Sequence, residues 1–365
     1  MTGVTFSVIV VSAIPGFLAA ALVLADRFVS NYGECRIQIN DNKTLDVQGG
    51  STLLDSLTEN QIFIPSACGG KGTCGYCKVK VLQGGGPVLP TEESYLDADE
   101  IKENVRLSCQ VKVRENLDIE IPEELLEIQQ YRAACERIRD LTHDIKEFRF
   151  RLSDPETISF RPGQYMQLLT PAYDGNEEVY RAYSIASDPA EVDMVEFVIR
   201  LVPGGICTTY CFNHLNEGDE MSMNGPYGDF YLRDTEAPML FVAGGSGMAP
   251  LKSILHDMKN TGNKREVTYF FGANEVRELF YMDDMRAFEE ELENFTFVPV
   301  VAQPEEGAEW DGETGLVTEP LERHIDDASG YEGYLCGSPG MIDAAVEVLK
   351  KLGMPEDRIY YDKFA

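Results

Sequence analysis

The stretch SACGGKGTCGYC, residues 66–77, places three cysteines and four glycines within twelve residues. Five residues separate Cys68 from Cys74, two separate Cys74 from Cys77, and the next cysteine is Cys109. A close triplet with a distant fourth thiol is typical of a [2Fe–2S] cluster, although the plant-type loop has four residues in its first gap. Structural zinc usually takes two separated short cysteine pairs. We therefore predict these four cysteines as cluster ligands, with a zinc site or a reduced cysteine pair as the alternatives.

The glycines between the cysteines suit this interpretation. They let the backbone wrap closely around a cofactor and adopt positive φ angles. Backbone N–H groups directed at sulfur stabilise a negatively charged cluster and tune its potential. Residues 66–86 contain three lysines and no Asp or Glu, in a chain of formal net charge −31. A stretch with basic and no acidic residues, in an otherwise acidic chain, fits an anionic cofactor.

The composition describes a globular protein with room for two or three domains in 365 residues. Its 62 acidic residues against 31 basic ones argue against a nucleic-acid partner. They favour docking to a basic protein surface, or simply solubility. The other five of the nine cysteines lack ligand spacing and are expected to be intracellular thiols, with Cys336 considered separately below.

The N-terminus is apolar. The first 25 residues carry no charge, and residues 6–25, FSVIVVSAIPGFLAAALVLA, match the ~20 residues that cross a ~30 Å hydrocarbon core. A secretory signal usually begins with a basic region, which this chain lacks. We therefore predict a membrane anchor helix over residues 1–30. The protein would be a single-pass protein of the inner (plasma) membrane, with its catalytic domains in the cytoplasm.

The rest of the chain predicts a multidomain α+β and α/β fold. Residues 31–125 read as a small β-grasp-like [2Fe–2S] domain, with a hairpin over residues 35–47 and a helix capped by Ser51. Short strands and frequent turns over residues 131–234 predict an antiparallel β-barrel. Apolar strands alternate with helical stretches over residues 235–365, which predicts a doubly wound parallel sheet.

Two motifs in the last domain indicate nucleotide binding. AGGSGMAP, residues 243–250, joins a strand to a helix start, so its backbone N–H groups form a site for a pyrophosphate. It departs from the usual dinucleotide fingerprint and could be a plain tight turn. YLCGSPGM, residues 334–341, ends a strand at the sheet edge where such ligands bind. Cys336 would then lie near the nucleotide, with a buried inert cysteine as the alternative.

Two motifs in the barrel region suit a flavin. RAYSIAS, residues 181–187, places a cation, an aromatic ring and a hydroxyl close together on one strand. Arg181 could bind phosphate, Tyr183 could stack on the ring and Ser184 could bond the reactive nitrogen, although Arg and Tyr alternate on many exposed strands. PGGICTTY, residues 203–210, offers Gly205 and Thr208 at a helix start, which suits the flavin pyrophosphate.

Taken in order, the cysteine loop, RAYS, GPYGDF (residues 225–230), GGSGMAP and CGSPGM resemble the ferredoxin:NADP+ reductase superfamily. With the apolar N-terminus and the terminal DKFA, the whole chain resembles the family of the F subunits of Na+-translocating NADH:quinone reductases. The resemblance implies an enzyme that passes electrons from NADH to FAD, then to the [2Fe–2S] cluster, then to integral-membrane redox subunits of a complex that reduces quinone.

The resemblance also implies roles for individual residues. Ser184 and Cys336 would lie at the site of hydride transfer, and Phe364 would cover the flavin until nicotinamide displaces it. Glu275 suits the ribose hydroxyls of NADH, although Arg277 stands nearby. The remaining residues that it assigns are the flavin binders Arg181, Tyr183, Gly205 and Thr208 and the NADH pyrophosphate binders Gly244, Gly245 and Gly247.

Two features depart from the pattern of that family. Nine residues separate Pro171 from Arg181, where the family carries a long insertion, and the chain ends in Phe-Ala rather than a glycine pair. The short core is similar to soluble reductases that supply phenol and toluene monooxygenases. A soluble metalloenzyme, such as an oxygenase, is therefore the alternative electron acceptor, and a redox-sensing or assembly module is a third hypothesis.

Overall fold

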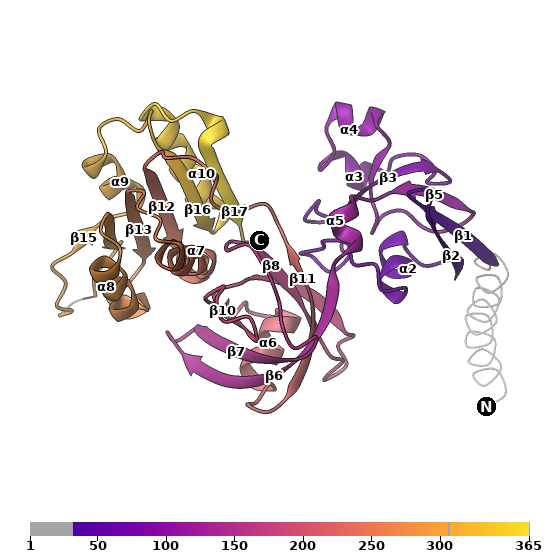
Figure 1. The fold of residues 1–365 in the computed structure, drawn as a ribbon, viewed down its shortest axis with the longest axis horizontal. Helices are drawn as coiled ribbons and strands as arrows, with labels where there is room; N and C mark the ends of the chain where they lie inside the picture. The colour runs from indigo at the N-terminus through magenta and orange to yellow at the C-terminus, as the bar shows by residue number, and fades with distance from the viewer. Residues whose placement is uncertain (1–31, 306, 365) are drawn as a thin grey trace, which may run out of the picture. The chain divides into compact units, whose positions relative to one another are not determined.

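The computed structural model describes residues 32–305 and 307–364, and the chain divides into two compact units between Ile128 and Gln129 (Figure 1). The predicted anchor helix over residues 1–30 lies outside the described residues. Among the helices that the structure describes, none is both long and apolar enough to cross a membrane.

The first unit contains a small five-stranded sheet in the order β2-β1-β5-β3-β4. The predicted hairpin is present, and Asn40 and Asp41 adopt positive φ angles in its turn. The helix that follows is capped by Thr52, whose side chain accepts a hydrogen bond from Asp55 N, and not by Ser51 as predicted. Ser51 instead forms an isolated bridge with Gly49. The elements are β1 Glu34–Ile39, β2 Lys43–Gln48, α2 Leu53–Glu59, β3 Lys78–Gln83, α3 Pro90–Glu93, α4 Ala98–Lys102, β4 Val105–Leu107, β5 Leu117–Glu120 and α5 Glu123–Leu126.

The second unit begins with the predicted antiparallel barrel, whose six strands follow the order β10-β7-β6-β11-β8-β9. An isolated bridge between Ile185 and Phe197 joins the two edge strands and closes the sheet. Phe148 and Phe150 point into its core because alternate residues of a strand face the same side. The elements are β6 Gln129–Asp140, β7 Ile145–Asp154, β8 Tyr165–Thr170, β9 Val179–Ser184, β10 Met194–Arg200, α6 Ile206–Asn213 and β11 Glu220–Tyr227.

The rest of this unit is the predicted doubly wound sheet, in which all neighbouring strands run parallel in the order β15-β14-β13-β12-β16-β17 (Figure 1). Successive residues of β12 face opposite sides, so Phe241 packs with α7 and Leu240 packs with α9 and α10. The elements are β12 Met239–Gly244, α7 Met248–Thr261, β13 Val267–Ala273, α8 Met282–Glu291, β14 Phe295–Val301, β15 Glu313–Thr314, α9 Thr318–His324, β16 Glu332–Gly337, α10 Pro339–Lys351 and β17 Ile359–Lys363, with short 3-10 turns at Gly245–Gly247, Val276–Glu278 and Glu356–Arg358.

Candidate functional site

The four predicted ligand cysteines come together as two pairs. Cys68 Sγ lies 3.4 Å from Cys74 Sγ within the loop. Cys77 directly precedes β3 and Cys109 follows β4, so the pairing of these strands brings the two thiols into hydrogen-bond contact. Within residues 32–305 and 307–364, no group of three His, Cys, Asp or Glu side chains is placed to hold one metal ion. Two pairs of thiols fit a cofactor with two metal centres, each held by one pair.

The loop glycines have the backbone geometry that the sequence analysis predicts. Gly69, Gly70, Gly72 and Gly75 all have φ between +63° and +81°. A Cβ atom on Gly72 would come within 2.5 Å of the Gln110 side chain, which is too close for a real contact. The Gln110 side chain can move away from a Cβ atom, so the left-handed turns are the reason that the loop needs glycine.

The thiols in each pair differ in acidity. A hydrogen bond from Cys74 lowers the pKa of the Cys68 thiol to about 4, and a hydrogen bond from Cys77 lowers the pKa of Cys109 to about 7. Hydrogen bonding within each pair, together with burial, raises the pKa of both Cys74 and Cys77. Each pair thus offers a sulfur that ionises readily, as a thiolate ligand must.

A buried ion pair supports the segment that carries the fourth cysteine. Arg106 Nη2 lies 2.6 Å from Glu92 Oε2, and both side chains are almost fully buried. Glu92 Oε1 also accepts a hydrogen bond from Leu107 N, and Arg106 donates to the carbonyl oxygens of Gly85 and Gly86. These contacts fix β4 and the start of the turn that presents Cys109. Sequence reasoning missed this pair, because its two residues match no short motif.

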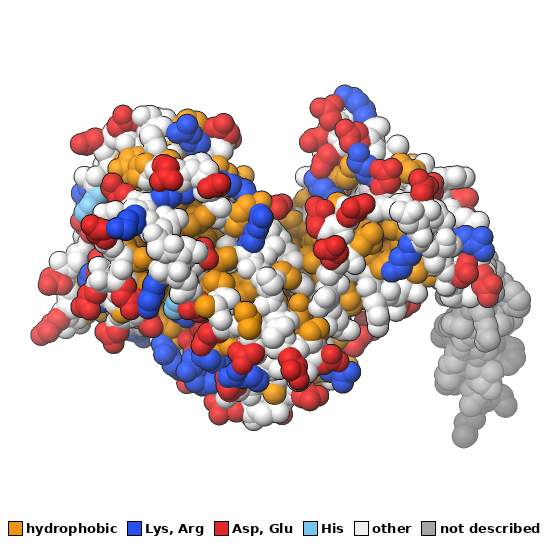
Figure 2. All heavy atoms as spheres, viewed as in Figure 1, with side chains coloured by type: hydrophobic (Ala, Val, Ile, Leu, Met, Phe, Trp, Pro, Cys, Tyr) orange, Lys and Arg blue, Asp and Glu red, His pale blue; other side chains and the backbone are white. Residues whose placement is uncertain are grey.

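The lysines near the loop are less available than the sequence suggests. Lys78 Nζ lies 2.6 Å from Glu100 of α4, and Lys80 Nζ lies 2.7 Å from Glu103 just after it. Acidic side chains gather around α4 in Figure 2. Two of the three lysines are therefore paired with carboxylates, and their charge does little to offset an anionic cofactor. Lys71 and the backbone N–H groups of the loop remain as sources of positive potential.

The predicted flavin residues lie on β9 at the edge of the barrel. Tyr183 is half-buried against the barrel core, and burial raises the pKa of its hydroxyl. Arg181 donates to the carbonyl oxygen of Tyr180 at 2.7 Å. On the neighbouring α6, Gly205 is the cap residue, and Thr208 Oγ1 accepts a hydrogen bond from Val202 N at 3.2 Å. Thr208 thus stabilises the turn that leads into α6.

The barrel and the parallel sheet meet at Ser184. Its Oγ donates to Asp362 Oδ2 at 3.4 Å, and Asp362 on β17 pairs in register with Cys336 on β16. Burial raises the pKa of Asp362 to about 6, and burial also raises the pKa of the Cys336 thiol. The structure thus brings the two predicted catalytic residues to one carboxyl group. Sequence reasoning missed Asp362, although it stands in the DKFA ending on which the resemblance rests.

The glycine-rich turn follows the carboxyl end of β12, next to β16. A Cβ atom on Gly247 would lie 2.2 Å from the carbonyl oxygen of Cys336, so only glycine allows this approach. Gly245 has a φ of +56°. Phe364 N donates to Gly337 O at 2.8 Å, which holds the C-terminal aromatic residue over the same edge. Because the strand order changes direction between β12 and β16, this edge is the switch point at which open α/β sheets bind ligands.

Glu275 follows β13 at the same edge of the sheet. Its carboxylate is engaged with Arg277, whose Nε lies 2.6 Å from Glu275 Oε2. Glu305 accepts a hydrogen bond from Val276 N at 2.9 Å and lies 3.9 Å from Arg277 Nε. Glu275 and Glu305 therefore neutralise Arg277, the cation that counts against a preference for NADH. The local charge at this turn stays negative.

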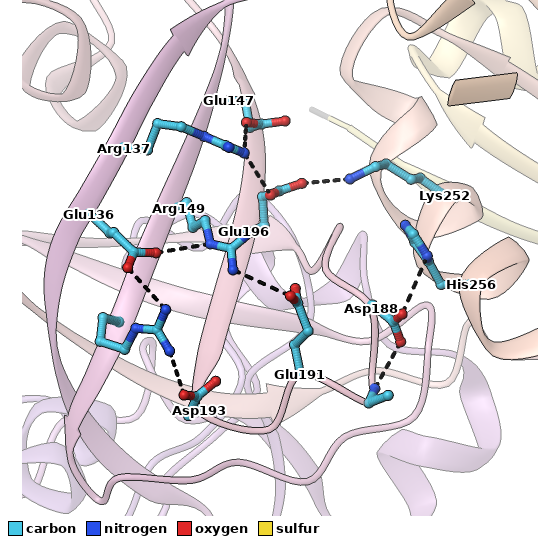
Figure 3. A network of polar contacts seen from close by, with 12 residues as sticks. Glu136, Arg137, Glu147, Arg149, Asp188, Glu191, Asp193, Glu196, Lys252 and His256 are labelled. Atoms are coloured by element: carbon cyan, nitrogen blue, oxygen red, sulfur yellow. Dashed lines mark hydrogen bonds and ion pairs between the residues drawn. The ribbon is translucent and has the colours of Figure 1, made fainter. Parts of the chain in front are cut away.

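A polar network ties α7, the helix after the glycine-rich turn, to the barrel (Figure 3). Lys252 Nζ lies 2.6 Å from Glu196 Oε1 of β10, and both side chains are buried. Arg137 of β6 lies 2.7 Å from Glu147 Oε1 and 3.6 Å from Glu196 Oε2. Burial raises the pKa of Glu196, whereas for Glu147 the hydrogen bond from Tyr281 and the nearby cations outweigh burial and lower the pKa.

A second part of the network joins α7 to the segment that follows the flavin strand. Ser253 Oγ donates to Ser187 O at 2.7 Å, and Asn260 Nδ2 donates to Asp188 Oδ1 at 2.6 Å. His256 Nδ1 lies 3.5 Å from Asp188 Oδ2 (Figure 3). Burial and the Lys252 charge lower the pKa of His256 to about 4, so it is neutral at pH 7. These contacts set the position of the glycine-rich turn relative to RAYS.

Three domain families match the chain. Residues 37–114 match the 2Fe-2S iron-sulfur cluster binding domain, residues 133–231 the oxidoreductase FAD-binding domain and residues 241–347 the oxidoreductase NAD-binding domain. These matches support the [2Fe–2S] cluster, FAD and NADH as cofactors, and they support a ferredoxin-reductase-like fold. The enzyme class predicted from the sequence, an NADH-dependent flavin and iron–sulfur oxidoreductase, is confirmed.

Curated relatives match nearly the whole chain. The chain is 34% identical to the F subunit of the Na(+)-translocating NADH-quinone reductase of Marinomonas sp. (strain MWYL1), over 99% of this chain and 98% of that protein. It is 35% identical to the corresponding protein of Pseudomonas aeruginosa (strain UCBPP-PA14), over 96% and 95%. Among solved structures, it resembles the Amycolatopsis cytochrome P450 reductase GcoB, with a TM-score of 0.73 and 28% identity over 90% of this chain and 98% of that one. The ferredoxin reductase in carbazole 1,9a-dioxygenase gives a TM-score of 0.70 and 26% identity, over 91% and 99%.

Proposed function

The chain belongs to the family of the F subunits of Na(+)-translocating NADH-quinone reductases, and on this basis we propose that it is the electron-input subunit of a membrane complex that reduces quinone. Its immediate electron acceptors would be integral-membrane redox subunits. Any ion transport would belong to those partners, because one apolar helix cannot form a transport pathway alone. Residues 1–30 would anchor the chain in the inner membrane by a single pass.

Each cofactor has a proposed set of binding residues. Arg181, Tyr183 and Ser184 would bind the flavin ring and phosphate, with Gly205 and Thr208 at the pyrophosphate. FAD held by these residues would supply the exchange between two-electron chemistry with NADH and one-electron transfer to a [2Fe–2S] cluster. The two cysteine pairs would each ligate one iron. The remaining proposed contacts, all to NADH, come from Gly244, Gly245, Gly247 and Glu275.

The observation that supports hydride transfer from NADH to the flavin as the first step is the hydrogen bond between Ser184 and Asp362 beside Cys336. Ser184 belongs to the barrel, which would bind the flavin, and Asp362 belongs to the parallel sheet, which would bind the nicotinamide. Their contact therefore lies where the two rings would meet. At pH 7 most Asp362 side chains are ionised, because the pKa of about 6 is below that pH. A carboxylate here would favour the positive charge that develops on a nicotinamide ring as its hydride leaves. Cys336 and Phe364 would exclude water from the same place.

The test is purification of the tagged full chain from its own membranes in a mild detergent, followed by mass spectrometry of what accompanies it. We expect several multi-span subunits and quinone reduction driven by NADH. A matched sample lacking residues 1–30 should lose the membrane fraction but keep NADH oxidation with an artificial acceptor. Recovery of a soluble metalloenzyme and no membrane subunits would contradict the proposal.

A further inference from the structure

Ser108 lies between two of the proposed cluster ligands. It directly precedes Cys109, and its backbone N donates to Cys77 O at 2.8 Å. Its carbonyl oxygen accepts a hydrogen bond from Leu54 N at 3.1 Å, so both backbone groups are satisfied. The residue is fully buried. Its position is therefore fixed by the backbone and not by its own side chain.

The hydroxyl of Ser108 has no regular hydrogen bond within residues 32–305 and 307–364. Leaving a buried hydroxyl without a partner costs about 1–3 kcal/mol, and alanine would avoid that cost at the same site. Lys78 is opposite Leu107 in the β3–β4 register, so Cys77 is opposite Ser108. Opposed residues of antiparallel chains present their side chains to the same face. A ligand sulfur therefore lies on the same face as the Ser108 hydroxyl, which interacts with the Cys77 thiol.

Gln110 makes a matching contact on the other side of Cys109. Its Nε2 lies 3.5 Å from Cys109 Sγ, and its Oε1 accepts a hydrogen bond from Thr91 Oγ1 at 2.9 Å. The Thr91 contact orients the amide so that its N–H group points toward the sulfur. The Gln110 amide and the Ser108 hydroxyl thus belong to the two residues on either side of Cys109, next to its pairing with Cys77.

We propose that, in the protein with its cluster bound, Ser108 donates a hydrogen bond to the Cys77 thiolate and Gln110 donates one to the Cys109 thiolate. These hydrogen bonds raise the reduction potential of the cluster. This inference rests on the proposed [2Fe–2S] site. The physical reason is electrostatic: reduction adds one negative charge, and hydrogen bonds to sulfur stabilise the more negative state. Removing a donor therefore makes the cluster harder to reduce.

The experiment compares Ser108→Ala with wild type and with Ser56→Ala, each in the full chain purified in mild detergent. Ser56 is a matched control because it is another buried serine of the same domain, on α2. The readouts are iron content, visible absorbance and a potentiometric titration followed by electron paramagnetic resonance. We expect full cluster content in all three. Ser108→Ala should shift the reduction equilibrium about tenfold against the reduced form, which is about 59 mV for one electron.

A second variant separates a hydrogen bond from a packing role. Ser108→Thr keeps the hydroxyl donor and adds no iron ligand, so its potential should stay closer to that of wild type than the potential of Ser108→Ala does. Equal potentials for Ser108→Ala, Ser56→Ala and wild type would overturn the inference while leaving the cluster site intact. It would also be overturned if neither Ser108 variant held a cluster that Ser56→Ala retains, since the role would then be structural. A wild-type chain without any [2Fe–2S] signal would instead contradict the proposed function itself.

Discussion

The substitution Lys252→Met leaves Glu196 buried without the ammonium group that lies 2.6 Å from its Oε1. Breaking a buried ion pair by removing one partner costs about 3–5 kcal/mol. Two features of this site reduce the cost. Arg137 Nη2 stays 3.6 Å from the other carboxylate oxygen, and burial already raises the pKa of Glu196, so the carboxylate can take up a proton instead. We therefore expect a loss of about 2–3 kcal/mol in the free energy of unfolding at pH 7.

The loss should depend on pH in a definite direction. Without Lys252 the folded-state pKa of Glu196 rises further above its unfolded value. The contribution of the group to stability is then fully present below the unfolded pKa and is lost as the pH rises through the folded one. The variant should thus come closest to wild type at acidic pH and differ most at neutral pH. It should also reduce its flavin more slowly with NADH, because Lys252 holds α7 and the glycine-rich turn against the barrel.

The assay is urea unfolding of the flavin-loaded unit over residues 129–365, followed by flavin release and by far-ultraviolet circular dichroism. The matched control is Lys259→Met on the same helix, whose 2.8 Å pair with Glu291 is exposed and should contribute less than about 1 kcal/mol. The double variant Lys252→Met/Glu196→Leu should recover most of the loss, since it leaves no unpaired buried charge. Equal stabilities for Lys252→Met and Lys259→Met, or a double variant no more stable than Lys252→Met, would show that this ion pair does not couple α7 to the barrel.

Three further predictions address the cofactor sites. Tyr183→Ala should lower the flavin content of the purified protein and leave the cluster absorbance unchanged; an unaltered flavin content would mean that the ring lies elsewhere. Asp362 has a folded pKa of about 6, above the ordinary value of 3.8, so its contribution to stability is greatest below about pH 4 and declines as the pH rises to about 6. Asp362→Asn should remove that decline, which amounts to about 3 kcal/mol at most, and urea unfolding of both proteins between pH 4 and pH 8 measures the difference. Gly247→Ala would place a Cβ atom 2.2 Å from Cys336 O, so the turn must shift, and overpacking of about 1–3 kcal/mol should raise the KM for NADH about tenfold or more without loss of flavin. An unchanged KM would show that NADH does not bind at this turn.

Sequence patterns predicted the elements whose formation depends on residues close together in the chain. The alternation in residues 35–47 predicted the β1–β2 hairpin, and strand–glycine–helix patterning predicted β12 and α7. The cysteine spacing predicted which thiols the structure brings together, since the loop and the β3–β4 pairing are short-range features. The cap of α2 shifted by one residue, because Ser51 and Thr52 both carry a suitable hydroxyl and sequence alone does not choose between them.

The contacts between the barrel and the parallel sheet, which sequence reasoning missed, join residues far apart in the chain. Ser184 and Asp362 are 178 positions apart, and Lys252 and Glu196 are 56 apart. Their partners become known only once the barrel and the parallel sheet are folded. The lysines near the cysteine loop show the same limit, because their pairing with Glu100 and Glu103 depends on where α4 packs.

The proposed route takes electrons from NADH through the flavin and the [2Fe–2S] cluster to a quinone-reducing membrane partner. Its decisive test is Cys74→Ala in native membranes, with NADH oxidation measured once with quinone and once with ferricyanide, which can accept electrons from reduced flavin. We expect quinone reduction and the cluster absorbance to be lost, while ferricyanide reduction and flavin content stay near the wild-type level. Undiminished quinone reduction in a variant without the cluster would mean that electrons do not take this route.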